Sequence, residues 1–158
     1  MKLIALAGSL LAFSCAAQAA PKKVPVKPKV TQPAWKNATP VQRQAVAAVI
    51  RAQLEAFKRD DWNKAATYQS QGLRKKFGTT AHFRNAIEGT YPQFANYKTV
   101  AFAQARALGN SVEMVVRLTG KDGVKLIAIY QMVKEKGGYK VGGVQGGVAA
   151  PTEDEAFT

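Results

Sequence analysis

Six side chains of the sequence have the chemistry of a general acid, a general base or a polar contact to a ligand. They are Asp60, Asp61, Tyr68, His82, Tyr91 and Tyr130. An apolar pocket moves the pKa of a carboxyl, imidazole or phenol group toward the value that proton transfer needs, so these groups are the first to consider for catalysis. Their positions along the chain also give each of them a structural role.

These structural roles account for all six residues without catalysis. The two consecutive aspartates stand where a second helix begins, and we expect them to cap it. His82 lies in the first turn of a later predicted helix, where a structural histidine is more common than a base. The tyrosines fit the edge of an aromatic core. We assign no catalytic residue, and the candidate pocket residues are Tyr68, His82, Tyr91 and Tyr130.

The sequence lacks the motifs of cofactor binding and of covalent catalysis. The chain has one His and one Cys, which nearly excludes a zinc site with several ligands. It has no serine-nucleophile motif, no phosphate-binding glycine loop and no metal-ligand spacing. We therefore expect neither a cofactor nor a metal.

A basic patch is the second candidate site. The chain holds 23 Lys and Arg against 10 Asp and Glu, which gives a net charge of +13. Such a surface suits an anionic cell-envelope polymer or an acidic partner protein, although charge that only keeps the protein soluble is the simpler explanation. Aromatic residues are not interleaved with the cations, so we expect no nucleic-acid partner. The candidate patch residues are Arg74, Lys75, Lys76, Lys134, Lys136 and Lys140.

The N-terminus has the three parts of a signal peptide, predicted over residues 1–19. Lys2 gives a positive start, and Leu3–Phe13 is an apolar run too short to span a bilayer. Ala17 and Ala19 then present small side chains at the two positions that a signal peptidase recognises. We expect cleavage between Ala19 and Ala20 and a periplasmic or secreted product.

Cys15 raises the alternative of a lipid anchor. A lipid-attachment cysteine usually follows a large aliphatic residue and two small ones, and Phe13 does not fit this pattern. Cleavage after Ala19 removes the single cysteine of the chain. The mature protein would then have neither a disulfide nor a thiol nucleophile.

Two segments of biased composition flank the predicted domain, which covers residues 39–146. Residues 20–38 hold four of the seven prolines and five lysines with no acid, so we expect an extended, solvated linker. Residues 147–158 follow a glycine-rich stretch and end in a small acidic cluster, which predicts a flexible acidic tail. The 158 residues suffice for one domain.

The first half of the domain is predicted to be helical. Thr39 and Gln42 form a capping box around Pro40, which suits the first position of a helix. Apolar residues then recur at helical spacing until about Asp60, at Val46, Ile50, Leu54 and Phe57. Three shorter helices should follow: one capped by the aspartates, one over Leu73–Phe77, and one from Thr79 or Thr80 to Tyr91-Pro92.

The second half of the domain is predicted to form strands. Apolar and polar residues alternate from Val112 to Leu118, which indicates a strand with one buried face. Short turns imply antiparallel neighbours, so we expect an α+β domain with a four-stranded meander, one face of which the first helix covers. The four predicted strands are Tyr97–Leu108, Val112–Leu118, Val124–Val133 and Tyr139–Val144.

The order of helices and strands resembles the nuclear transport factor two-like, or cystatin-like, superfamily. More narrowly, the chain resembles a bacterial family known only as domain of unknown function forty-eight sixty-four. The residues that carry this resemblance are Gln53, Ala56, Phe57, Asp60, Asp61, Ala65, Phe77, Phe83, Tyr91, Pro92 and the run from Gly137 to Gly142. A tryptophan is common in the last strand of that family, and Tyr139 stands in its place here, so a pocket at that strand would differ in shape.

The resemblance implies a cone-shaped domain with a pocket between sheet and helices, but it brings no residue with an assigned activity. We therefore keep three hypotheses open. The first is a non-catalytic module that binds an unknown small ligand or protein. The second is a small-molecule enzyme that uses the pocket, and the third is a binder of anionic envelope polymers. The superfamily often dimerises through its sheet, so the resemblance also implies a candidate homodimer.

The predicted signal peptide gives a testable prediction. When the full chain is expressed in a bacterial host, N-terminal sequencing of the exported protein should begin at Ala20. A maleimide should then label the precursor through Cys15 and leave the mature protein unlabelled, because cleavage removes the cysteine. An acylated Cys15 at the mature N-terminus would show that the lipid-anchor alternative is right.

Overall fold

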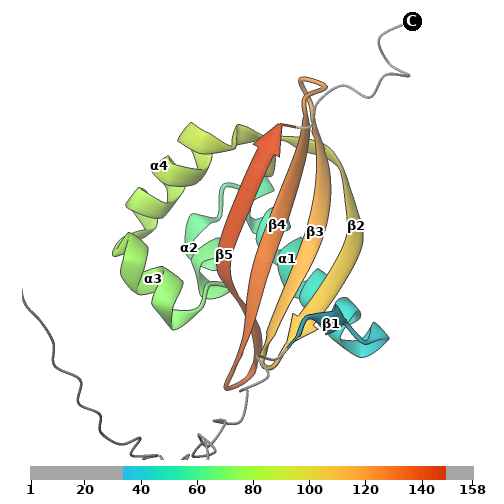
Figure 1. The fold of residues 1–158 in the computed structure, drawn as a ribbon. Helices are drawn as coiled ribbons and strands as arrows, with labels where there is room; N and C mark the ends of the chain where they lie inside the picture. The colour runs from blue at the N-terminus through green and yellow to red at the C-terminus, as the bar shows by residue number, and fades with distance from the viewer. Residues whose placement is uncertain (1–33, 149–158) are drawn as a thin grey trace, which may run out of the picture. The chain divides into compact units, whose positions relative to one another are not determined.

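The computed structural model of this chain describes residues 34–148 (Figure 1). The predicted signal peptide with its cleavage between Ala19 and Ala20, the linker up to residue 33 and the tail from residue 149 lie outside the described residues. Between residues 34 and 148, no helix is long and apolar enough to cross a membrane.

The helices begin where side chains can accept hydrogen bonds from their first free backbone amides. Thr39 accepts a bond of 3.2 Å from the amide of Gln42, whose own side chain accepts one of 2.9 Å from the amide of Thr39. Asp61 caps the second helix through the amide of Lys64, whereas Asp60 does not act as the expected cap. The helical elements are α1 (Pro40–Lys58), α2 (Trp62–Thr67), α3 (Gln71–Phe77), α4 (Thr80–Thr90) and the 3-10 turn η1 (Pro92–Phe94).

The sheet has five antiparallel strands in chain order, and not the four that the sequence predicts. The strands are β1 (Lys36–Asn37), β2 (Tyr97–Leu108), β3 (Ser111–Gly120), β4 (Lys125–Glu135) and β5 (Gly138–Val148). Four of them match the predicted meander, with the last strand continuing past its expected end at Val144 to Val148. The α+β class is therefore confirmed, and the strand number is wrong by one.

The additional strand, β1, comes from the end of the segment predicted as linker. Lys36 lies opposite Ala107, and Asn37 lies opposite Arg106 at the edge of the sheet. The amide of Ala38 then donates a bond of 3.0 Å to the carbonyl of Ala105. Prolines cannot donate such bonds, but residues after the last proline of the segment can, and this pairing ends the extended linker earlier than composition indicates.

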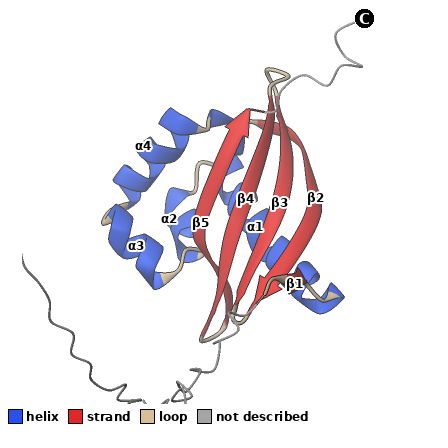
Figure 2. Cartoon of the chain, viewed as in Figure 1, coloured by secondary structure: helices blue, strands red, loops and turns tan. Residues whose placement is uncertain are grey.

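The helices lie on one side of the sheet, and the core fills the space between them (Figure 2). As expected, α1 covers this face and contacts β2, β3 and β5. Its side chains Val46, Ile50 and Leu54 are fully buried there. The buried side chains of the sheet, such as Leu118 and Met132, alternate with exposed or half-buried ones along their strands, as the period of two requires.

Tyr97 ties α1 to the start of β2. Its ring is buried, its hydroxyl donates a hydrogen bond to the carboxylate of Glu55, and the Lys58 ammonium lies 4.5 Å from the ring centre. Burial raises the pKa of Tyr97 from its ordinary value of 10.0 to about 12, and the bond to Glu55 acts in the same direction. The folded protein therefore favours the neutral phenol.

This raised pKa predicts a loss of stability at alkaline pH. Above pH 10 the unfolded chain releases the Tyr97 proton while the folded chain keeps it, so the free energy of unfolding should fall as pH rises from about 10 to about 12. We expect Tyr97→Phe to reduce this slope and to cost about 1 kcal/mol at neutral pH through the lost hydrogen bond. Urea unfolding at several pH values measures both effects.

Tyr139→Phe on β5 is the matched control for this experiment, because Tyr139 is half-buried and the structure gives its hydroxyl no part in the Glu55 contact. An alkaline slope that is the same in Tyr97→Phe and in the control would show that Tyr97 does not carry the pH dependence.

Candidate functional site

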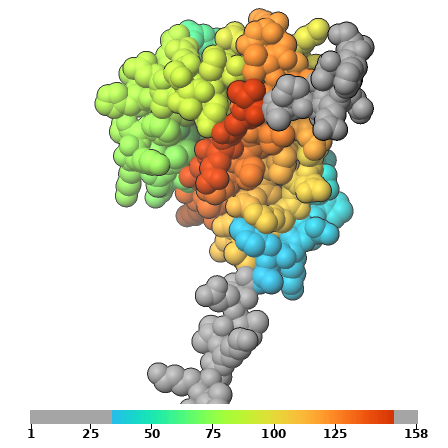
Figure 3. All heavy atoms as spheres, turned by 45° about the horizontal axis from the view of Figure 1, so that its top comes forward, coloured from blue at the N-terminus to red at the C-terminus, as the bar shows by residue number. Residues whose placement is uncertain are grey.

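A cavity of about 340 Å³ opens between β5 and the pair of helices α3 and α4. Figure 3 shows the side chains of these two helices, in green, gathered beside β5, in red. The residues that line the cavity come from both layers of the fold: Gln53, Phe57, Gly72, Leu73, Lys76, Phe77, Phe83, Ile87, Phe94, Tyr130, Gln131, Val141, Gly142, Gly143, Val144 and Gln145.

Backbone hydrogen bonds fix α3 to β5 at one end of the cavity. Val141 donates to the carbonyl of Tyr68 and accepts from the amide of Ser70, each at 2.8 Å, so that Gln69 pairs with Val141 as in a parallel sheet. Ser70 also caps α3 by accepting a bond of 3.1 Å from the amide of Leu73. The start of α3 is thus set by the same residue that contacts the strand.

A tyrosine makes the connection between α4 and β5. Tyr91 follows the last residue of α4, and its hydroxyl donates a bond of 2.7 Å to the carbonyl of Gly146. The Tyr91 ring lies against the backbone of Gly146, where an added Cβ atom would be in ordinary van der Waals contact at 3.4 Å. Together with the bonds of Val141, this contact holds the helices beside the strand at two separate points.

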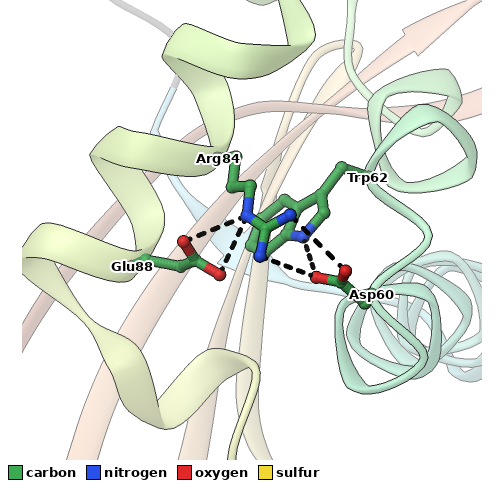
Figure 4. A network of polar contacts seen from close by, with 4 residues as sticks. All are labelled: Asp60, Trp62, Arg84 and Glu88. Carbon is green, nitrogen blue, oxygen red and sulfur yellow. Dashed lines mark hydrogen bonds and ion pairs between the residues drawn. The ribbon is translucent and has the colours of Figure 1, made fainter.

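A polar network joins α4 to the turn before α2 (Figure 4). Arg84 forms an ion pair of 3.0 Å with Asp60, and its Nε lies 3.1 Å from both carboxylate oxygens of Glu88. Asp60 also accepts a bond of 2.7 Å from the Trp62 indole, over which the Arg84 guanidinium lies. Asp60, which the sequence offered as a helix cap or a general acid, therefore connects α4 to the start of α2. It does not line the cavity.

Aromatic rings form the inner wall of the cavity. Phe57 contacts Phe83 and Phe94 at centroid distances of 5.6 and 6.5 Å, and Phe83 contacts Phe77 at 5.2 Å. Phe94 meets the ring of Tyr130 edge to face at 6.0 Å. Such tilted and T-shaped pairs give the wall a fixed shape, because they favour particular ring orientations beyond simple burial.

Tyr130 is the polar exception in this wall. Its side chain is 1% exposed, and among the described residues its hydroxyl has no hydrogen-bond partner. Burial raises the pKa of Tyr130 well above its ordinary value, and the nearby Tyr97 acts in the same direction. The phenol is therefore a neutral group that can donate one hydrogen bond into its surroundings and cannot act as a base near neutral pH.

The four candidate pocket residues do not converge on one site. Tyr130 lines the cavity, and Tyr91 bonds to β5 without lining it. Tyr68 ends α2, with its ring 6.0 Å from the Lys64 ammonium. His82 is exposed, does not line the cavity, and its Nδ1 lies 3.2 Å from the carbonyl of Phe77.

Sequence reasoning missed the amides of the cavity. Gln53 is 2% exposed and donates a bond of 3.2 Å from its side chain to the carbonyl of Ala65. The available signal was its position on α1, because it lies three residues after the buried Ile50 on the apolar side of the helix. A polar residue in an apolar stripe indicates a buried hydrogen bond or a cavity wall.

The six residues of the candidate basic patch lie on two separate elements and differ in their contacts. Arg74, Lys75 and Lys76 are all exposed in the last turn of α3, but only Lys76 lines the cavity. On the β4–β5 hairpin, Lys140 donates a bond of 2.8 Å to the carbonyl of Thr67. Lys134 and Lys136 of the same hairpin are exposed.

Titratable groups are few in the cavity. Of its lining residues, Lys76 and Tyr130 are the two that titrate, and no Asp, Glu or His is among them. Between residues 34 and 148, no cluster of His, Cys, Asp and Glu is suited to hold a metal ion. The arrangement can bind an apolar group, donate hydrogen bonds and contact a negative charge.

Helices packed on one face of a curved antiparallel sheet, with a cavity between them, define an NTF2-like α+β domain. A solved structure of an NTF2-like protein of unknown function from Shewanella baltica OS155 has this fold, with a TM-score of 0.50 and 14% identity over 73% of this chain and 100% of that chain. The family model of the domain of unknown function DUF4864 matches residues 39–153, and the chain belongs to this family. No curated protein matches the sequence.

The unpartnered hydroxyl predicts an unusual response to mutation. Tyr130→Phe should change the free energy of unfolding by less than about 1 kcal/mol, because it breaks no hydrogen bond among the described residues and keeps the ring that lines the cavity. Tyr97→Phe is the matched comparison, since it removes a bonded hydroxyl from a buried ring. Urea unfolding at neutral pH gives both values. A loss of more than about 1 kcal/mol in Tyr130→Phe would contradict this assignment.

Proposed function

We propose that this domain is a non-catalytic binding module that holds a small, mainly apolar ligand between β5 and helices α3 and α4. The observation that carries the proposal is the cavity of about 340 Å³, which has an aromatic wall and the unpartnered hydroxyl of Tyr130. Binding sites for small molecules typically combine an apolar lining with a few polar groups that fix the orientation of the ligand.

The wall of the cavity offers apolar surface to a ligand. An apolar group placed there would gain van der Waals contacts with side chains such as Phe77 and Ile87. The hydroxyl of Tyr130, which also lines the cavity, is available to donate a hydrogen bond to an acceptor on the ligand. A ligand that is apolar along its length and carries an acceptor near its inner end would make both kinds of contact.

The composition of the wall favours binding over catalysis. A pocket enzyme needs a group that accepts or donates a proton near the operating pH, and such groups are usually Asp, Glu or His. The titratable residues of this wall are Lys76 at an exposed position and Tyr130 with its raised pKa. The small-molecule enzyme therefore stays the weaker alternative.

The binding of anionic envelope polymers is a second candidate, supported by the three consecutive exposed cations of α3. It differs from the first candidate in one respect that can be tested. A polymer would use Arg74 and Lys75 as much as Lys76, because long-range attraction depends on total charge and not on which side chain faces the cavity.

We also propose that the protein works in the periplasm or outside the cell. The support is the order of charge, apolar run and small residues within positions 1–19 of the sequence. A cavity that takes up a sparingly soluble molecule would suit such a location.

The proposal predicts saturable binding of a neutral apolar probe. N-phenyl-1-naphthylamine should gain fluorescence on binding to the wild-type domain, and Ile87→Trp should weaken its affinity by about tenfold or more, because the larger ring occupies the cavity. Fluorescence titration measures both affinities, and circular dichroism verifies the fold of the variant.

Val41→Trp is the matched control, since Val41 lies on α1 with 76% of its surface exposed and does not line the cavity. Its affinity for the probe should equal that of the wild type. Binding that survives Ile87→Trp unchanged would place the probe elsewhere on the protein and overturn the proposal.

A further inference from the structure

We propose that the ligand is a small amphiphilic anion, with an apolar chain inside the cavity and a single carboxylate or phosphate group bound by Lys76 at its edge. This inference rests on the proposed function, because it names the chemical class of the molecule that the same cavity takes. The observations that carry it are the position of Lys76, the absence of acids from the wall, and the contrast with the two neighbouring cations.

The position of Lys76 follows from the spacing of α3. Lys76 and Phe77 lie three and four residues after Leu73, so all three fall on one side of the helix. All three line the cavity, together with Val144 of the facing strand. An exposed ammonium group beside the aromatic part of the wall is the arrangement that an amphiphile requires, since its charged end stays near water while its chain is buried.

Lys76 forms no ion pair with an acid among the described residues. The ion pairs found between described residues involve Arg84 and Arg106. None of the lining residues is acidic. The acid that contacts α3 is Glu135, which accepts a bond of 3.0 Å from the amide of Gln71 at the opposite end of the helix.

The two cations next to Lys76 differ from it in their position relative to the cavity. Arg74 and Lys75 lie in the same turn and are equally exposed, but neither lines the cavity. They increase the positive potential near the opening, which attracts any anion. A direct contact with the head group of a bound molecule is assigned to Lys76 alone.

The test uses two competitors that differ in one group. Decanoate and decanol have chains of equal length, and only decanoate is charged at neutral pH. Each displaces N-phenyl-1-naphthylamine from the wild type, from Lys76→Gln and from Lys75→Gln. The Lys75→Gln variant is the matched control, since it removes the same charge from the adjacent position without touching the cavity wall.

We expect Lys76→Gln to lower the affinity for decanoate by about fivefold, as for one partly exposed charge contact, and to change the affinity for decanol by less than about twofold. Lys75→Gln should change the affinity for either competitor by less than about twofold. Added salt should lower the affinity of the wild type for decanoate and have little effect on its affinity for decanol. Decyl phosphate, tested in the same way, reports whether a phosphate head group binds more tightly than a carboxylate.

A charge-reversal variant gives an independent measurement. Lys76→Glu should weaken decanoate further and should strengthen decyltrimethylammonium relative to the wild type, because the sign of the contact is inverted. This gain of binding cannot come from a variant that merely folds poorly.

The outcomes separate the two proposals. If decanol displaces the probe but Lys76→Gln lowers the affinity for decanoate no more than Lys75→Gln does, the proposed contact of Lys76 with an anionic head group is wrong, and the proposed binding of an apolar ligand is retained. If Lys76→Gln lowers the affinity for both competitors equally, Lys76 contributes packing and the proposed charge contact is wrong. If the probe binds but neither competitor displaces it, and calorimetry detects no binding of decanoate, the amphiphilic anion is wrong. The proposed function fails only if the probe does not bind or if Ile87→Trp leaves its affinity unchanged.

Discussion

The cavity depends on the two hydrogen bonds that Val141 makes to the backbone between α2 and α3. Each is 2.8 Å long, and together they attach a helical connection to an edge strand that has no further neighbour in the sheet. An edge strand exposes unpaired amide and carbonyl groups, and here the chain uses one residue of that edge to position α3. Together with the bond that Glu135 accepts from the amide of Gln71, this attachment sets the distance of α3 from β5 and so the shape of the space between them.

The same attachment explains why a polar residue is buried beside the cavity. Gln69 pairs with Val141 and is 1% exposed, and its side-chain nitrogen has no hydrogen-bond partner among the described residues. A buried amide without a partner costs free energy, which the surrounding contacts must offset. The aromatic contacts that run from Phe57 to Tyr130 supply a rigid layer against which the helices pack. The cavity is thus bordered by hydrogen bonds on its strand side and by rings on its inner side.

Local rules predicted most of the fold, and long-range contacts account for what they missed. The capping box at Thr39 and the alternation along β3 depend on residues close in sequence, so both could be recognised from the chain alone. β1 could not, because Lys36 pairs with Ala107 across a long stretch of chain and two residues carry no periodic signal. The cavity wall was hard to predict for the same reason. Tyr130 could be named from its type, but the inclusion of Gln53 and Lys76 depends on how three separate elements pack.

The three cations of α3 illustrate how structure distinguishes residues that composition treats alike. All of them lie in the last turn of a seven-residue helix, where positive charge interacts favourably with the unpaired carbonyl groups of the helix end. This effect explains why basic residues are favoured at that end of the helix, and it applies to Arg74, Lys75 and Lys76 equally. It does not explain why one of them borders a cavity whose lining contains no acid. A helix end is stabilised by positive charge anywhere in its last turn, whereas contact with a group in the cavity requires a charge at one particular position, and of the three cations Lys76 alone has it.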